Sequence, residues 1–138
     1  MKNVTIIGTN YENNLFIAKK ISKLLNLKLV NINEKIEESL IATYNFPLQF
    51  ADKFMQEKES KIIKQAANVE GTIILVKDDE FLANENYKHF EDSLTILIEY
   101  NQKDKIKEKI QELLKSHCKI SLKYENLKLK DIVTLIRG

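Results

Sequence analysis

Short strand-like segments alternate with amphipathic segments along the chain, and this alternation restricts the fold more than any other feature of the sequence. The strand-like segments have the length and the apolar, β-branched composition that favour strands. They are Val4–Ile7, Leu27–Ile32, Thr72–Val76, Leu94–Glu99 and Lys119–Lys123. Strands that are separated by helices pair in parallel, with the helices on both faces of the sheet. The sequence therefore predicts an α/β fold with a parallel sheet between two layers of helices.

The segments between these strands carry apolar residues at helical spacing. In the first of them, Ile17, Ile21 and Leu24 fall on one stripe of a helix. The expected helices are Asn13–Leu25, Asn33–Ile41, Ala51–Val69, Phe81–Asp92, Lys103–Lys115 and Leu127–Ile136, with a loop or short helix at Pro47. No repeat, low-complexity tract or domain boundary interrupts this pattern.

Three local details follow from residue types. Asn33 is expected to cap the second helix, because it precedes Glu34 in a helical pattern. Asp78 or Asp79 is expected to cap the fourth helix for the same reason. Thr72–Val76 is the most apolar strand, so we expect it at the centre of the sheet.

Length and composition favour one globular domain and exclude several classes of function. The chain has 138 residues, of which 43% are hydrophobic and 30% charged. The net charge of +2 comes from interspersed Lys and Glu, which predicts neither nucleic-acid nor membrane binding. No apolar run approaches the ~20 residues of a membrane helix, and no signal peptide is recognisable. The single cysteine, Cys118, permits no internal disulfide, so we expect a cytoplasmic protein.

The order and spacing of these segments resemble the shikimate kinase family. The similar stretches are NVTIIG, IAKKISKLLNLKLVNINEKIEE, KFMQEKESKII, EGTIILVKDD, SLTILIEY and CKISLKYENLKLKDIVTLI, which cover nearly the whole chain. The resemblance implies the P-loop nucleoside-monophosphate-kinase-like fold: a three-layer sandwich with five parallel strands in the order 2-3-1-4-5. It also implies one domain over residues 1–138, and ATP, magnesium and shikimate as the family's ligands.

The family's phosphate-binding motif is degenerate in this chain. A Walker A loop reads G-x-x-x-x-G-K-[ST], because its backbone N–H groups and lysine hold phosphates and its hydroxyl holds magnesium. Here Gly8 keeps the first glycine, while Asn13, Asn14 and Leu15 replace the second glycine, the lysine and the hydroxyl residue. Glu12 adds a carboxylate where a triphosphate would lie. We therefore expect the phosphate contacts to be lost, although Asn13 tolerates the left-handed backbone that would preserve the turn.

The substrate motifs are degenerate as well. The Asp-x-Asp motif, which the family uses for magnesium and for the substrate hydroxyl, becomes Asn31-Ile32-Asn33. The arginine that would hold the substrate carboxylate is replaced by Met55. The resemblance thus assigns Asn31 to a lost metal contact, and Asn33 and Met55 to lost substrate contacts.

Two further family features are missing from the second half of the chain. The Gly-Gly-Gly stretch beside the substrate falls on Lys77-Asp78-Asp79, and Tyr100 leads directly into the Lys103–Lys115 helix, so the lid is expected to be deleted. These losses do not depend on the alignment, because the chain has one arginine, Arg137, and three glycines. A lysine cannot reproduce the planar fork with which an arginine holds a carboxylate.

The leading hypothesis is a catalytically degenerate shikimate-kinase-like protein with a binding or regulatory role and no cofactor or metal. Asn14 and Asn33 would then be relics of catalytic positions, and the partner would be another protein or a second copy of the chain. One alternative is a divergent shikimate kinase that uses ATP and magnesium. Another is a protein-interaction module with no small ligand.

Two clusters at the expected ligand edge of the sheet have more than one interpretation. Asp78, Asp79 and Glu80 either bind a cation or, as we favour, begin a helix. The asparagines near Asn14 and Asn31 either form a neutral polar pocket or belong to relic loops. His89 and His117 lack partners at metal-ligand spacing.

Overall fold

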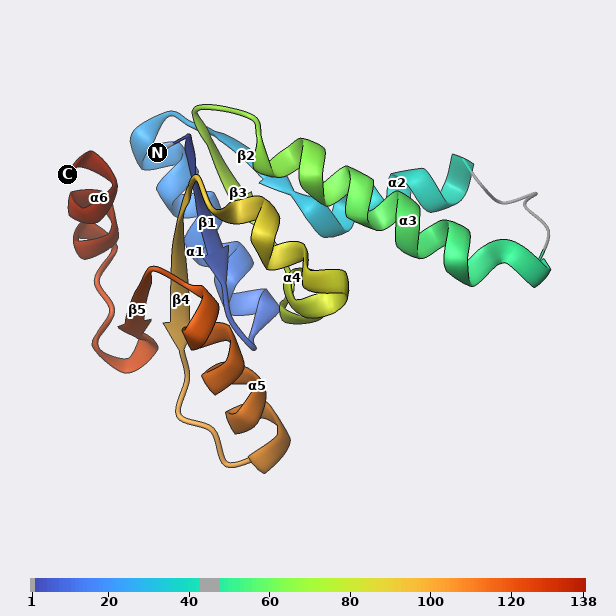
Figure 1. Cartoon of the computed structure of the whole chain (residues 1–138). Coiled ribbons are helices and arrows are strands. Elements are labelled where there is room, and N and C mark those ends of the chain that lie inside the picture. The colour runs from blue at the N-terminus through green and yellow to red at the C-terminus, as the bar shows by residue number, and fades with distance from the viewer. Residues whose placement is uncertain (1, 43–47) are drawn as a thin grey trace.

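A computed structural model describes the backbone of residues 2–42 and 48–138, and the side chains of residues 2–39 and 55–138. Pro47 lies outside the described residues. Five strands form one parallel sheet in the order β2-β3-β1-β4-β5 (Figure 1). They are β1 (Asn3–Ile7), β2 (Lys28–Asn31), β3 (Thr72–Leu75), β4 (Ser93–Glu99) and β5 (Ile120–Lys123). The predicted fold class and strand order are confirmed.

The prediction of the central strand from apolarity alone is wrong. The central strand is β1, and β3 lies between β2 and β1. Both β1 and β3 have a neighbour on each side and helices on each face, and every residue in both strands is buried. Apolar content therefore separates interior strands from edge strands, and it does not rank the interior strands among themselves.

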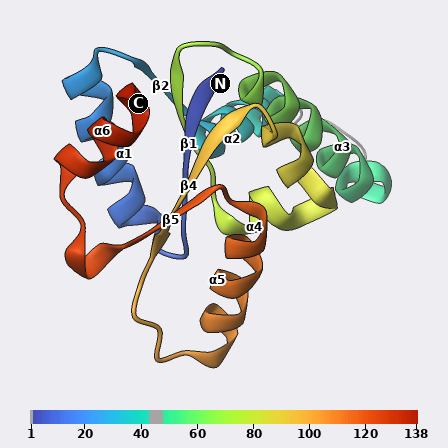
Figure 2. The same ribbon diagram turned by 60° about the vertical axis from the view of Figure 1, so that its left-hand side comes forward.

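Helices cover both faces of the sheet, which confirms the three layers (Figure 2). One face carries α1 (Tyr11–Leu25) and α6 (Leu129–Arg137). The other carries α3, α4, α5 and the 3₁₀ stretch η1, while α2 runs from the end of β2 alongside α3. Their bounds are Ile32–Ala42 for α2, Leu48–Ala67 for α3, Asp78–Leu82 for α4, Ala83–Phe90 for η1 and Lys105–His117 for α5, and a second 3₁₀ turn, η2, spans Tyr124–Asn126.

The core consists of two apolar clusters, one on each face of the sheet. Alternate residues of a strand point to opposite faces. Ile73 and Leu75 of β3 therefore pack with Ile17 and Ile21 of α1. Ile74 packs on the opposite face, in the cluster that includes side chains of α3, α4 and α5. Burial of the sheet on both sides fixes the ends of its strands, and these ends position the candidate site.

Two of the predicted helix caps differ from the observed ones by one or two residues. Asn31, and not Asn33, caps α2, because β2 ends at Asn31 and the Asn31 Oδ1 accepts the Glu34 N–H at 3.4 Å. Helix α4 begins at Asp78, so its cap is Lys77, whose N–H donates to the Glu80 Oε1 at 2.9 Å. Neither predicted aspartate is the cap.

The predicted helix Phe81–Asp92 is broken. Asn84 and Glu85 adopt left-handed backbone conformations, with φ of 51° and 56°, and they separate α4 from the rest of η1. Asparagine accepts this conformation more readily than most residues. The break lets the buried Asn86 turn inward, where its Nδ2 donates to the Glu80 carbonyl at 3.0 Å.

Candidate functional site

The connection between β1 and α1 is much shorter than a phosphate-binding loop requires. Strand β1 ends at Ile7 and α1 begins at Tyr11, two residues before the predicted start of the helix at Asn13. Asn10 caps the helix: its Oδ1 accepts the Asn13 N–H at 3.1 Å, and its carbonyl accepts the Asn14 N–H at 3.0 Å. These two N–H groups are therefore not available to a phosphate.

The left-handed turn that Asn13 was expected to permit does not occur. Asn13 lies in the first turn of α1, and Asn26, Asn84 and Glu85 are the only described non-glycine residues with positive φ. The residues that a Walker A loop would wrap around a phosphate are here the start of a helix. Leu15, at the position of the magnesium-binding hydroxyl, packs against the core on the α1 face of the sheet.

Gly8 is required here for close packing and not for its conformational freedom. A Cβ atom on Gly8 would lie 2.7 Å from the Ile98 carbonyl oxygen and 2.9 Å from the Asn14 Nδ2. The Asn14 side chain therefore lies directly against Gly8, and Asn14 is only 1% exposed. The resemblance assigns this position to the Walker A lysine, and the structure has a buried amide there.

Tyr100 closes the space above Asn14. Its hydroxyl donates to the Asn14 Oδ1 at 2.7 Å, and its ring packs on Tyr124 with centroids 4.9 Å apart. Burial, with Tyr124 nearby, raises the pKa of the Tyr100 hydroxyl above its ordinary value, so it remains a proton donor at neutral pH. The Asn14 Nδ2 is buried without a hydrogen-bond partner among the described residues.

The segment after β4 is attached both to α5 and to the loop after β1. The Tyr100 N–H donates to the Gln111 Oε1 at 2.8 Å, and the Gln111 Nε2 donates to the Tyr100 carbonyl at 3.0 Å. The Gln102 Nε2 donates to the Thr9 Oγ1 at 2.5 Å. Residues 100–104, which join β4 to α5, thus lie across the position that the resemblance assigns to phosphates.

A second group of contacts fills the neighbouring part of the same sheet edge. The Asn31 Nδ2 donates to the Tyr11 hydroxyl at 2.7 Å, and the Lys77 Nζ lies 4.9 Å from the centre of the Tyr11 ring. With its Oδ1 on Glu34, Asn31 uses both ends of its amide. We call the two groups together the polar layer: Thr9, Tyr11, Asn14, Asn31, Lys77, Tyr100, Gln102 and Gln111.

The structure brings only some of the predicted site residues into the polar layer. Asn14 and Asn31 belong to it, and Gly8 lies beneath Asn14. Asn33 instead donates to the Glu37 Oε1 at 3.2 Å on the exposed side of α2. Met55 is half-buried on α3 and is not a member of the polar layer.

Sequence analysis did not assign roles to Thr9, Tyr100, Gln102 and Gln111. Their signal was present, because the polar run Tyr100-Asn101-Gln102 follows β4 directly. The ends of parallel strands meet at one edge of a sheet, and ligands of such folds bind there. The polar run after β4 is therefore expected to lie close to Gly8, which follows the neighbouring strand β1.

Asp78 and Asp79 lie in the first turn of α4, where their carboxylates accept backbone N–H groups. The Asp79 N–H donates to the Asp78 Oδ1, and the Glu80 N–H donates to the Asp79 Oδ1, both at 2.9 Å. Among the residues that the structure describes, no group of three or more His, Cys, Asp or Glu side chains is placed to hold a metal ion. The carboxylates are also favoured in this first turn by the helix dipole.

The carboxyl group of Glu80, next to Asp79, is less stable in its charged form than it would be in water. Burial raises the pKa of Glu80; the bond from the Lys77 N–H opposes this rise, and nearby Asp79 adds to it. Burial and Asp79 likewise raise the pKa of Glu59 on α3. The contact between α3 and α4 therefore favours protonated carboxyl groups.

Glu80→Gln is expected to stabilise the protein at pH 7 by roughly 0.5 kcal/mol after allowance for solvent screening. A carboxyl whose pKa is raised by folding contributes full stability below its ordinary pKa and loses it as the pH rises through the raised value. Glutamine keeps the acceptor for the Lys77 N–H without the charge. Urea denaturation from pH 4 to 7 should show the gain of the variant growing with pH; a constant difference would contradict the assignment.

An open pocket of about 530 Å³ remains beside the polar layer, lined in part by Thr9, Glu12, Lys77 and Lys107. Lys77 is held over the Tyr11 ring, and the Glu12 carboxylate opposes an anion in the same space. The pocket thus lacks the converging N–H groups and cations with which a triphosphate is clamped.

The parallel sheet in this order, between two layers of helices, has a P-loop kinase-like fold. Within that class the chain has a shikimate-kinase-like fold. It is similar to shikimate kinase from Aquifex aeolicus, with a TM-score of 0.74 and 17% identity over 99% of this chain and 96% of that one.

Two other shikimate kinase structures give the same result. For the protein from Bacteroides thetaiotaomicron the TM-score is 0.70 at 10% identity, covering 99% of both chains. For that from Acinetobacter baumannii, solved in complex with shikimate, it is 0.69 at 9% identity, covering 99% of this chain and 91% of that one. No family model and no curated protein matches the sequence. At these identities the likeness is one of fold.

Proposed function

We propose that this chain is a catalytically inactive shikimate-kinase-like protein that serves a binding or regulatory role. The observation that carries the proposal is the contact of Gly8, Asn14 and Tyr100. The Asn14 amide lies against Gly8, it is 1% exposed, and the Tyr100 hydroxyl closes over it at 2.7 Å. A buried amide and a tyrosine ring thus stand where the resemblance assigns an outward-reaching lysine.

The electrostatics support the same proposal. Phosphoryl transfer depends on fixed positive charge and N–H groups placed around the transferred group. At this edge the Walker A lysine is Asn14, the first N–H groups of α1 bond to Asn10, and the one arginine of the chain, Arg137, lies in the last turn of α6. No member of the usual clamp is present.

We also propose that the chain is one domain over residues 1–138 whose lid has been deleted. Helix α5 begins at Lys105, so residues 100–104 alone connect it to β4. This connection bonds to Thr9 and Gln111 and leaves little length for a closing segment.

A cytoplasmic location and a protein partner or second copy belong to the same proposal. Within the described part of the chain, no helix is both long and apolar enough to cross a membrane.

Titration calorimetry with ATP–magnesium, followed by a coupled assay of ADP release with shikimate, tests this proposal. We expect no saturable nucleotide binding up to about 5 mM, which exceeds the usual range of KM values. Saturable binding together with turnover would instead support a divergent shikimate kinase.

Residual turnover can come from a contaminating kinase, and Asn14→Ala distinguishes the two sources. If the chain itself is the catalyst, the variant should lose turnover, since Asn14 occupies the phosphate position. If turnover is unchanged, it is not catalysed at this site. Circular dichroism confirms that the variant is folded before the comparison is made.

A protein-interaction module is the second candidate, and one observation favours it. Ile106 and Leu113, two turns apart on α5, are 71% and 50% exposed. Exposed apolar side chains on one stripe of a helix are typical of contact surfaces. Multi-angle light scattering combined with the ligand titrations tests this candidate: a concentration-dependent dimer that binds no small molecule supports the module, and a monomer that binds a small ligand excludes it.

A further inference from the structure

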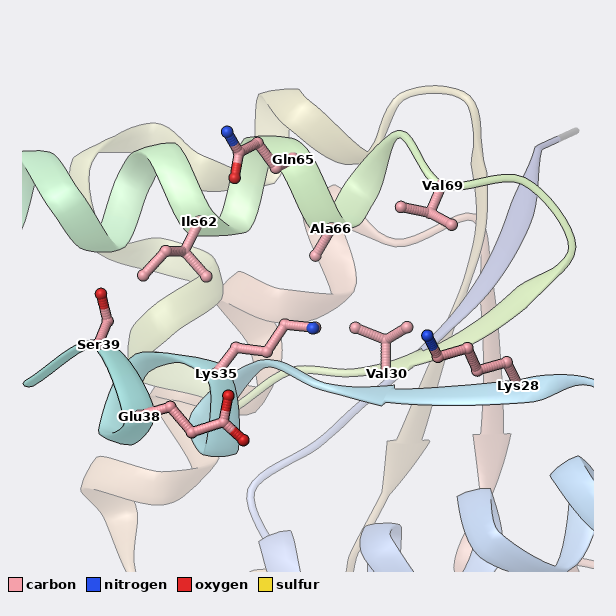
Figure 3. A pocket seen from close by; sticks show the side chains of 9 residues that line it. All are labelled: Lys28, Val30, Lys35, Glu38, Ser39, Ile62, Gln65, Ala66 and Val69. Atoms are coloured by element: carbon pink, nitrogen blue, oxygen red, sulfur yellow. The ribbon is translucent and has the colours of Figure 1, made fainter. Parts of the chain in front are cut away.

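A second pocket lies in the angle between β2, α2 and α3 (Figure 3). Its volume is about 450 Å³, which falls within the range of small-molecule sites. Lys28 begins β2 and Val69 lies three residues before β3, so one end of the pocket lies toward the amino ends of these strands. It shares no residue with the polar layer at the opposite edge of the sheet.

The inner wall of this pocket is apolar. Val30 of β2 and Ala66 of α3 are buried members of the core cluster, and Ile62 packs beside them. Val69, at the rim, is 47% exposed, which is high for a large apolar side chain in this protein. A ligand with an apolar body would remove the remaining surface of these residues from water.

Two cations from different elements face this apolar wall. Figure 3 shows the amino groups of Lys28, from β2, and Lys35, from α2, on either side of Val30. Neither forms an ion pair with any residue whose side chain the structure describes. Two ammonium groups over one apolar wall repel each other, and an anion between them would relieve that repulsion.

An acidic group in the lining limits the charge of the ligand. The Glu38 carboxylate lines the α2 side of the pocket and repels a second negative group. The pocket offers no arginine fork and no helix N-terminus, which are the features that favour phosphate groups. We therefore propose that this pocket binds a free monocarboxylic acid with an apolar body, the carboxylate between Lys28 and Lys35 and the body against Val30.

Titration calorimetry with 3-phenylpropionate on the full chain tests the site. We expect saturable binding, about tenfold weaker binding of the neutral 3-phenylpropionamide, and about 100-fold weaker binding of 3-phenylpropionate to Lys28→Gln/Lys35→Gln. The matched control Lys130→Gln removes an exposed lysine from α6 and should bind like the wild type. Equal affinity for the acid and its amide, or no saturation at all, would overturn the proposal.

A substitution at the rim gives an independent test that leaves the core intact. Val69→Glu places a carboxylate beside the two ammonium groups and should weaken binding about tenfold, whereas Val69→Thr should not. Chemical shifts in ¹⁵N-resolved spectra should change at Val30, Ala66 and Val69. Shifts confined to Thr9 and Gln102 would place the ligand at the polar layer and refute the assignment. Tighter binding of acetyl-Gly-Phe would assign the site to a chain terminus and exclude a free acid.

Discussion

Asn14→Lys, which restores the Walker A lysine, is expected to destabilise the protein by about 3–5 kcal/mol. The Asn14 side chain is 1% exposed, it lies against Gly8, and it meets the Tyr100 hydroxyl at 2.7 Å. A lysine here would bury a charge, and its extra length would displace Tyr100. Because small domains are stable by only about 5–15 kcal/mol, the loss should be evident in the midpoint of urea denaturation.

Asn13→Lys is the matched control, since it makes the same exchange one residue earlier in the first turn of α1. Asn13 is only partly buried; its backbone N–H contributes to the cap, and its side chain hydrogen-bonds near the Tyr100 hydroxyl. We expect a loss of at most about 1 kcal/mol, which is typical of one hydrogen bond at a partly exposed position. Equal midpoints for the two variants would show that Asn14 does not fill the loop as described.

Gly8→Ala is expected to cost about 1–3 kcal/mol, the range for overpacking in a dense interior. The new Cβ would lie 2.7 Å from the Ile98 carbonyl oxygen, which is part of β4, and 2.9 Å from the Asn14 Nδ2. The β4 backbone cannot move without disturbing its pairing with both β1 and β5. Denaturation in urea with an unchanged m-value measures the loss.

Gly71→Ala separates this packing effect from a conformational one. Gly71 has a positive φ of 68° and nothing within 4 Å of an added Cβ, so its substitution strains the backbone without a clash. Gly8→Ala, in contrast, produces a clash without straining the backbone conformation. If a crystal structure of Gly8→Ala shows Asn14 and Tyr100 in unchanged positions, the close packing at Gly8 is refuted. For Gly71→Ala we expect the surrounding residues to keep their positions.

Much of the fold could be predicted because the alternation of strands and helices is a local property of the sequence. The order of the strands came from the resemblance to a family, since periodicity does not say which strands are neighbours. The central position was wrongly given to Thr72–Val76 because β1 and β3 are equally buried. The break at Asn84 was missed because the residues around it keep a helical pattern.

The losses at the candidate site could be predicted by counting, because one arginine and three glycines cannot supply the family's motifs in any alignment. What replaced those motifs could not be predicted. Asn14 and Tyr100 are 86 residues apart in the sequence, and the β1–β4 register, which pairs Ile7 with Leu97, is what brings them together. The early start of α1 depended in turn on Asn10, an N-cap that sequence analysis passed over.

The closed polar layer has a consequence for the amount of folded protein in a cell. A site whose donors and acceptors await a ligand leaves part of its folding free energy dependent on the concentration of that ligand. Here Tyr100, Gln102 and Asn31 supply most of those partners from within the chain. The fraction of folded protein should therefore depend little on the concentration of ATP–magnesium.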